Sequence, residues 1–202
     1  MIRAVNINGR FYQNWTLISD IIIINILWLA VTLIGCGITF GAATTASYTV
    51  SNKIVNKKSY SVFKDFFQAF KNNFKESTIA WLIIALLGVV CFFNYGVVIR
   101  IDSFLFTVIF YISVFQLAIT TLYIFNVIAT FEGNFAKFIV SSFLMANKHF
   151  WTTILVLSSL LGTVFLTLNV SSFLNLIAWG FYFISTSYWT NRIFETYKKS
   201  IG

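Results

Sequence analysis

Four long stretches of this chain contain no charged side chain. Together they hold 127 of the 202 residues, and they run from 21 to 52, from 77 to 99, from 103 to 131 and from 149 to 191. A helix needs about 20 predominantly apolar residues to cross a bilayer. The pattern therefore predicts an all-α, polytopic membrane protein, a helical bundle with five to six transmembrane helices.

Six segments suit a membrane span, at residues 15–34, 38–54, 79–99, 104–129, 151–168 and 173–190. The second is only mildly hydrophobic and is rich in Gly, Ala, Ser and Thr, which let helices approach one another closely. It suits either a span shielded inside the bundle or a re-entrant hairpin, and hydropathy leaves both open. We expect residues 1–202 to form a single integral membrane domain.

Lysine and arginine gather between the predicted spans. Cytoplasmic loops carry an excess of these residues, and residues 51–78 alone contain six lysines. If the segment 38–54 crosses the bilayer, 13 basic residues lie inside and one outside; otherwise the numbers are 11 and 3. The first arrangement is favoured. It places both termini in the cytoplasm and Asp102 in an outer turn, and the last hairpin turns at 169–171.

Residues 62–75 predict an amphipathic helix on the cytoplasmic side. Five Phe side chains fall in one arc about 100° wide when each residue is rotated by 100° from the last. They are Phe63, Phe66, Phe67, Phe70 and Phe74, and the flanking lysines are Lys64, Lys71 and Lys75. Such a pattern is typical of a helix lying in an anionic membrane surface. It would equally suit a helix that docks a partner protein.

A weaker counterpart of this segment lies at residues 131–150. At an offset of 75 residues, Asn72 aligns with Asn147, and residues 77–79 align with 152–154. The match suggests an internal duplication of span, surface helix and span.

The composition excludes several classes of protein. Hydrophobic residues make up 58% of the chain and charged residues 10%, whereas a soluble domain has about 45–50% and 25%. The phosphate-binding glycine motifs of nucleotide-binding proteins are absent. The net charge of +8 is explained by topology and anionic lipid, so we expect no nucleic-acid partner.

Candidate chemistry is sparse. No ionisable side chain lies well inside a predicted span, which disfavours proton relays and ion-coupled transport. The single histidine, His149, lacks the Ser, Cys and Asp neighbours of a catalytic array. We therefore expect no enzymatic activity, no cofactor and no bound metal.

The candidate buried polar residues are the amides Asn25, Gln116 and Asn126. Their simplest role is hydrogen bonding between helices, and their alternative role is to line a pocket for a sugar or a lipid headgroup. Amides that face one another would favour a small transporter or channel-like protein. Amides buried singly beside an exposed apolar flank would favour a non-enzymatic accessory subunit.

Four segments together resemble one family. They are the polar start before Trp15, N-I-L-W-L at 25–29, F-G-A-A-T-T-A at 40–46, and F-K-D-F-F-Q-A-F-K-N-N-F-K at 63–75. Over nearly its whole length the chain resembles the YesL-like family of small bacterial integral membrane proteins. Relatives commonly carry a proline where this chain has Gly41 and Ala42, which implies a softer helix break here.

The resemblance implies a place in the cell membrane of Gram-positive bacteria. Members tend to be encoded beside carbohydrate ABC transporters and glycoside hydrolases, so the resemblance implies a link to carbohydrate uptake. The apolar runs predict the lipid bilayer as one partner, and the resemblance implies a carbohydrate ABC transporter permease as another. The resemblance transfers no catalytic residue.

Overall fold

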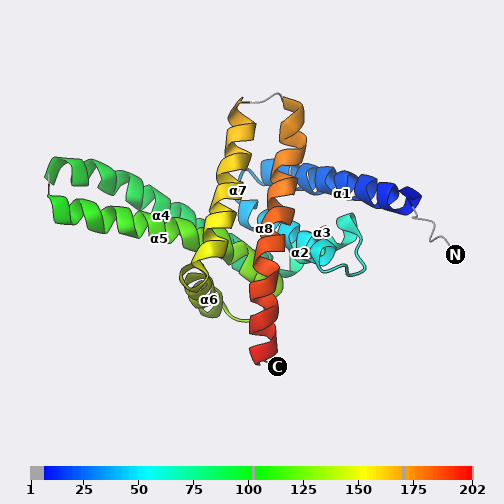
Figure 1. Cartoon of the computed structure of the whole chain (residues 1–202). Coiled ribbons are helices and arrows are strands. Elements are labelled where there is room, and N and C mark those ends of the chain that lie inside the picture. Colours follow the sequence, from blue (N-terminus) through cyan, green and yellow to red (C-terminus); the bar gives the residue numbers. More distant parts are fainter. Residues whose placement is uncertain (1–6, 102, 170–171, 202) are drawn as a thin grey trace.

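The computed structural model describes residues 7–101, 103–169 and 172–201. These residues form eight helices and no strand, so the all-α prediction is confirmed (Figure 1). The helices are α1 (Ile7–Ile34), α2 (Phe40–Val55), α3 (Val62–Asn72), α4 (Phe74–Ile101), α5 (Phe104–Thr130), α6 (Phe135–Lys148), α7 (Phe150–Asn169) and α8 (Ser172–Ile201).

Four of these helices are long and apolar enough to cross a membrane, as judged by length and composition within the described residues. They are Trp15–Ile34, Phe74–Ile101, Phe104–Thr130 and Phe150–Asn169. Helices of this length and composition indicate a membrane protein. A helix also covers each of the other two predicted spans, as α2 and α8, but neither is among the four. A total of five to six crossings therefore stays a prediction.

The orientation in the membrane also stays a prediction. The predicted outer turn at Asp102 and residues 170–171 of the last turn lie outside the described residues, as does Arg3 of the N-terminal basic segment.

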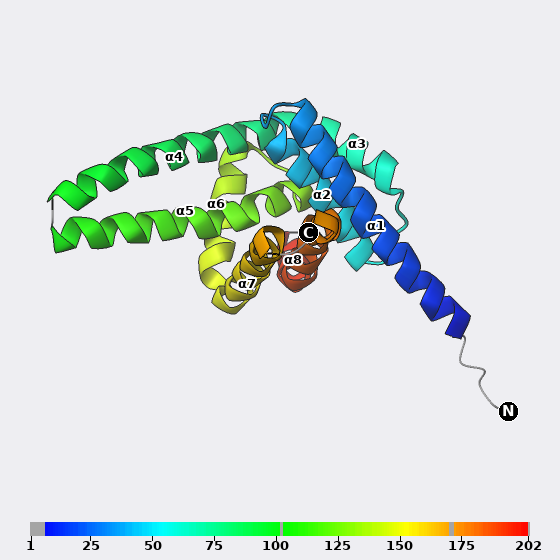
Figure 2. The ribbon, with the colours of Figure 1, turned by 90° about the horizontal axis from the view of Figure 1, so that it is seen from above.

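Two helical hairpins leave a common core in different directions. α4 and α5 lie side by side and project to one side, whereas α7 and α8 lie side by side and run across the first pair (Figures 1 and 2). α1 extends away from the α4–α5 hairpin (Figure 2). The helices thus converge at their inner parts, and their outer parts diverge.

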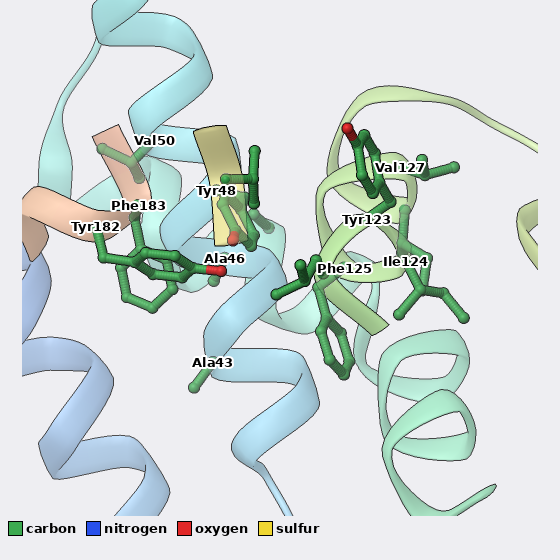
Figure 3. Close-up of a cluster of buried hydrophobic side chains, with 14 of the residues drawn as sticks. Ala43, Ala46, Tyr48, Val50, Tyr123, Ile124, Phe125, Val127, Tyr182 and Phe183 are labelled. Carbon is green, nitrogen blue, oxygen red and sulfur yellow. The ribbon is translucent and has the colours of Figure 1, made fainter. Parts of the chain in front are cut away.

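Helix α2 forms the centre of the core. It contacts α1, α3, α4, α5 and α8, and ten of its 16 residues are buried. In Figure 3 its Tyr48 lies between Tyr182 and Phe183 of α8 on one side and Phe125 of α5 on the other. Edge-to-face ring contacts, such as the one of 5.1 Å between the centroids of Tyr48 and Phe183, hold these helices together.

The small side chains of α2 explain its burial. A Cβ atom at Gly41 would lie 2.3 Å from the carbonyl oxygen of Ser77, so glycine is what lets α2 and α4 approach this closely. At 1.5 Å per residue α2 is about 24 Å long, shorter than the roughly 30 Å hydrocarbon core. These features favour a helix shielded by its neighbours, and its crossing of the bilayer stays a prediction.

The order of elements repeats along the chain. α3 is followed by a break at Asn73 and then by α4, just as α6 is followed by a break at His149 and then by α7. A shift of 75 residues carries α3 onto 137–147, inside α6, and carries Tyr48 onto Tyr123, which is also buried. The arrangement supports the duplication that the sequence suggests.

The predicted surface helix at 62–75 is shorter than expected. α3 ends at Asn72, and Phe74 and Lys75 belong to the first turn of α4. At this break the side-chain amide of Asn73 donates to the carbonyl oxygen of Ala69, which also accepts the backbone N–H of Asn73. Asn side chains compete with helical backbone bonds in this way.

Candidate functional site

The five Phe of the predicted surface helix divide between core and surface. Phe66 is fully buried in the hydrophobic core and Phe70 is half-buried against it. Phe63 and Phe67 lie one turn apart and are 56% and 50% exposed. Phe74, at the start of α4, is 39% exposed. One side of the predicted apolar face therefore packs against the hydrophobic core, and the other side is exposed.

The lysines of this segment all lie on its exposed surface. Lys64 and Lys71 are exposed on α3, and Lys75 is exposed on α4. These lysines and the exposed Phe63 and Phe67 form a surface with the composition of a membrane-surface or partner helix. That role stays a prediction.

An ion pair fixes α3 to α2. Nζ of Lys53 lies 2.9 Å from Oδ1 of Asp65, and the backbone N–H of Ser61 donates to Oδ2 of Asp65 at 2.9 Å. Burial acts to raise the pKa of Asp65, but the hydrogen bonds from Lys53 and Ser61, with the charges of Lys53 and Lys64, lower it below its ordinary value. The carboxylate is therefore held ionised at the junction of the two helices.

A buried layer of amides and hydroxyls joins α2, α5 and α8. Asn126 is fully buried, and its Nδ2 donates to Oγ1 of Thr190 at 2.9 Å. Nδ2 of Asn52 donates both to Oδ1 of Asn126 and to Oγ1 of Thr130, each at 2.9 Å. Three helices thus share one hydrogen-bonded group, which we call the amide layer (Asn52, Asn126, Thr130 and Thr190).

The other two predicted amides lie elsewhere. Nε2 of Gln116 donates to Oγ1 of Thr120 at 3.3 Å, within α5. Ten residues separate Gln116 from Asn126 along the same helix, about 15 Å at 1.5 Å per residue, so the structure does not bring Gln116 into the amide layer. Asn25 is fully buried in α1.

A polar cleft opens beside the amide layer. It consists of two pockets of about 340 Å³ and 180 Å³, which share Thr49, Lys53, Ala129 and Thr130. The larger pocket extends toward α3 and is also lined by Asp65, Gln68, Asn72, Asn73 and Glu132. The smaller extends toward α8 and is also lined by Asn52, Asn56, Lys58, Asn191 and Lys198. We call the two pockets together the amide cleft.

The amide cleft was not predicted from the sequence. The end of α2 was treated there as the edge of a span, and its lysines only as a signal of orientation. The sequence did contain a signal for this cleft, since the lysine-rich segment 51–78 also contains four asparagines, Asn52, Asn56, Asn72 and Asn73. Their convergence with α5 and α8 depends on contacts between residues that are far apart in the sequence.

A second polar contact ties α1 to the turn before α3. The hydroxyl of Tyr60 donates to Oδ2 of Asp20 at 2.5 Å, and Asp20 is only 8% exposed. Burial raises the pKa of Tyr60 to about 12, and the hydrogen bond to Asp20 and the charge of that carboxylate act in the same direction. The neutral phenol is thus favoured in the folded protein.

Replacing Tyr60 with phenylalanine is expected to lower the free energy of unfolding by about 1–2 kcal/mol, because the buried carboxylate of Asp20 loses the hydrogen bond that it accepts from the Tyr60 hydroxyl. A raised pKa stabilises the fold fully below the unfolded value of 10, and the contribution is lost as the pH rises through about 12. Chemical denaturation of both proteins at pH 8 and at pH 11 would measure the difference. We expect it to shrink at the higher pH, whereas Tyr95→Phe, at an exposed position, should change little at either.

The described residues contain no cluster of three or more His, Cys, Asp or Glu side chains that could hold a metal ion. Burial, together with the charge of Lys148, lowers the pKa of His149. The amide cleft presents amides, hydroxyls and ammonium groups together with the carboxylates of Asp65 and Glu132, and such groups bind polar solutes by hydrogen bonds and charge.

The chain is similar to one family of unknown function and to two proteins of Bacillus subtilis. Residues 21–95 match a family described as "Protein of unknown function, DUF624". The chain is 27% identical over 147 residues to the uncharacterized protein YteU of Bacillus subtilis, covering 70% of this chain and 66% of YteU, just under two thirds of that relative. It is 26% identical over 177 residues to the uncharacterized protein YesL of the same organism, covering 86% of this chain and 83% of YesL. No solved structure matches the chain.

Proposed function

We propose that this chain, a YesL-like protein, is a non-enzymatic accessory component of another membrane complex and is linked to carbohydrate uptake. The observation that carries the proposal is the projecting α4–α5 hairpin. Only Ser77 and Ala80 of the 28 residues of α4 are buried, and Phe92, Phe93 and Phe104 are 75%, 70% and 85% exposed. So large an apolar flank suits contact with lipid and with another membrane protein.

Small residues on this hairpin support a helical partner. A Cβ atom at Gly88 or at Gly96 would meet nothing within 4 Å. Glycines on an open face let a second transmembrane helix approach the backbone closely. The separate placement of Gln116 and Asn126 points the same way, because an accessory role needs no shared pore.

The choice of partner rests on the resemblance to YesL-like proteins, whose members tend to be encoded beside carbohydrate ABC transporters. We therefore infer a permease of that class in a Gram-positive cell membrane. Docking uses either the α4–α5 hairpin or the exposed face of α3 with Lys71 and Lys75, and variants of the two surfaces separate these routes.

Co-purification of the tagged full-length chain with a co-expressed carbohydrate ABC permease pair tests the proposal. We expect a complex that survives mild detergent and is lost in Gly88→Phe with Gly96→Phe, because the added rings block helix approach. Gly162→Phe on α7 is the matched control, since a Cβ there also meets nothing within 4 Å. Loss of the complex only in Lys71→Glu with Lys75→Glu would move the docking site to α3. Absence of any complex with the wild-type chain would contradict the proposal.

The amide cleft favours a second candidate function, a small transporter with a polar path between helices. The cleft reaches Thr130 and Asn52 of the amide layer, and the buried Oγ atoms of Ser51 and Ser187 have no hydrogen-bond partner among the described residues. Uptake of a labelled sugar into proteoliposomes that contain only this chain would support transport. Uptake equal to that of empty liposomes would contradict transport by this chain and would favour the accessory role.

A further inference from the structure

We infer that the smaller pocket of the amide cleft binds a phosphate group. Three lysines line this pocket, Lys53, Lys58 and Lys198, and none of its lining residues is acidic. Lys53 is paired with Asp65, which lines only the larger pocket. Lys58 and Lys198 form no ion pair with any described residue. The pocket therefore carries two uncompensated positive charges.

The backbone fixes the position of Lys58. The N–H of Lys57 donates to the carbonyl oxygen of Ile54, and the N–H of Lys58 donates to that of Lys53. Lys57 lies in the left-handed region, at φ 52°. This is the Schellman arrangement that closes a helix, so Lys58 is held over the end of α2 rather than on a free loop.

The Schellman arrangement also weakens the repulsion between the C-terminal end of α2 and a bound anion. The C-terminus of a helix carries about half a negative charge, which would repel an anion. At α2, the carbonyl oxygens of Asn52, Lys53 and Ile54 already accept bonds from the turn. The two full positive charges on Lys58 and Lys198 outweigh the partial negative charge that remains at the end of α2.

Neutral donors and the size of the pocket complete the site. Asn191 lines it, and its side chain has no hydrogen-bond partner among the described residues. A volume of about 180 Å³ is below the 300–1,000 Å³ typical of drug-sized ligands. Phosphate bound by lysine charge and amide donors fits that volume. The group has two sources, an anionic phospholipid headgroup at the membrane surface and a phosphorylated solute in water, and basic pockets between membrane helices are known for the first.

Native mass spectrometry of the full-length chain, released from vesicles of equal phosphatidylglycerol and phosphatidylcholine, tests the site. We expect the wild type to retain phosphatidylglycerol preferentially. Lys58→Gln with Lys198→Gln should reduce this retention about 25-fold, because each lysine near an anionic surface contributes roughly a factor of five. Lys57→Gln with Lys137→Gln removes the same charge from exposed positions outside the pocket and should leave most of the preference intact.

Two further measurements complete the experiment. Lys58→Arg with Lys198→Arg should keep the preference, which shows that charge in a folded protein is what matters. Added glycerol 3-phosphate should leave the lipid bound if the source is a headgroup, and should displace it if the source is a soluble phosphate ester. Either result supports a phosphate site. Equal retention of the two lipids by the wild type, or equal losses in the two glutamine pairs, would overturn it.

Discussion

Replacing Gly41 with alanine is expected to destabilise the protein by about 1–3 kcal/mol, the usual range for overpacking a core. The new Cβ would lie 2.3 Å from the carbonyl oxygen of Ser77 and 2.8 Å from Cβ of Trp81. A backbone carbonyl cannot rotate away as a flexible side chain can, so α2 must move away from α4. Because α2 contacts five other helices, that movement disturbs much of the core.

The sign of the effect makes this a sharp test. Alanine in place of glycine normally stabilises a helix interior, such as the position of Gly88 in α4, by about 0.8–1.0 kcal/mol. Gly88→Ala on α4 is the matched control, since its Cβ would meet nothing within 4 Å, and it should be neutral or stabilising. Thermal unfolding in one detergent would compare the two variants. A Gly41→Ala protein as stable as Gly88→Ala would show that α2 and α4 do not approach at this point.

The sequence predicted most elements of the fold because each depends on local pattern. Uncharged apolar runs placed the long helices, and the small residues of 40–46 predicted a helix that neighbours could shield. α2 is buried in that way. The end of α3 at Asn72 was missed because the hydrophobic periodicity continues across it, with Phe70 and Phe74 four residues apart.

The rotation of α3 shows a second limit. Periodicity gives the angles between side chains on a helix, but not which part of an apolar arc faces the core. Phe66 packs inward, whereas Phe67, its neighbour in sequence and in the same arc, is half exposed. That division is set by contact with α2, which the sequence of α3 does not contain.

The candidate site could be predicted only in part for a related reason. Asn126 stood out as an amide in an apolar run, but its partner Asn52 lies 74 residues away. Lys53 and Asp65 are closer in sequence, yet their pairing depends on how α3 folds back onto α2. Such pairs are properties of the packed core, and one sequence carries no direct sign of them.

Asn126→Leu is expected to destabilise the protein by about 1–3 kcal/mol. Leucine has the same branched arrangement of four side-chain heavy atoms and is bulkier than asparagine, so the change removes polarity without leaving a cavity. It breaks the bonds to Asn52 and Thr190, and a buried polar group that loses its partner costs about 1–3 kcal/mol. Polar pairs between membrane helices average about 0.6 kcal/mol and reach about 1.7, which places the expected loss in the lower part of the range.

Gln116→Leu is the matched control for this prediction, because it removes an amide from the same helix. Its side chain is half-buried and bonds only within α5 among the described residues, so the change should stay within about 0.5 kcal/mol. Equal unfolding free energies for the two variants would contradict a stabilising amide layer. The pair also separates the two candidate functions. If Asn126→Leu lowers stability but leaves permease binding intact, the layer is structural, whereas unchanged stability with abolished sugar uptake would place Asn126 on a transport path.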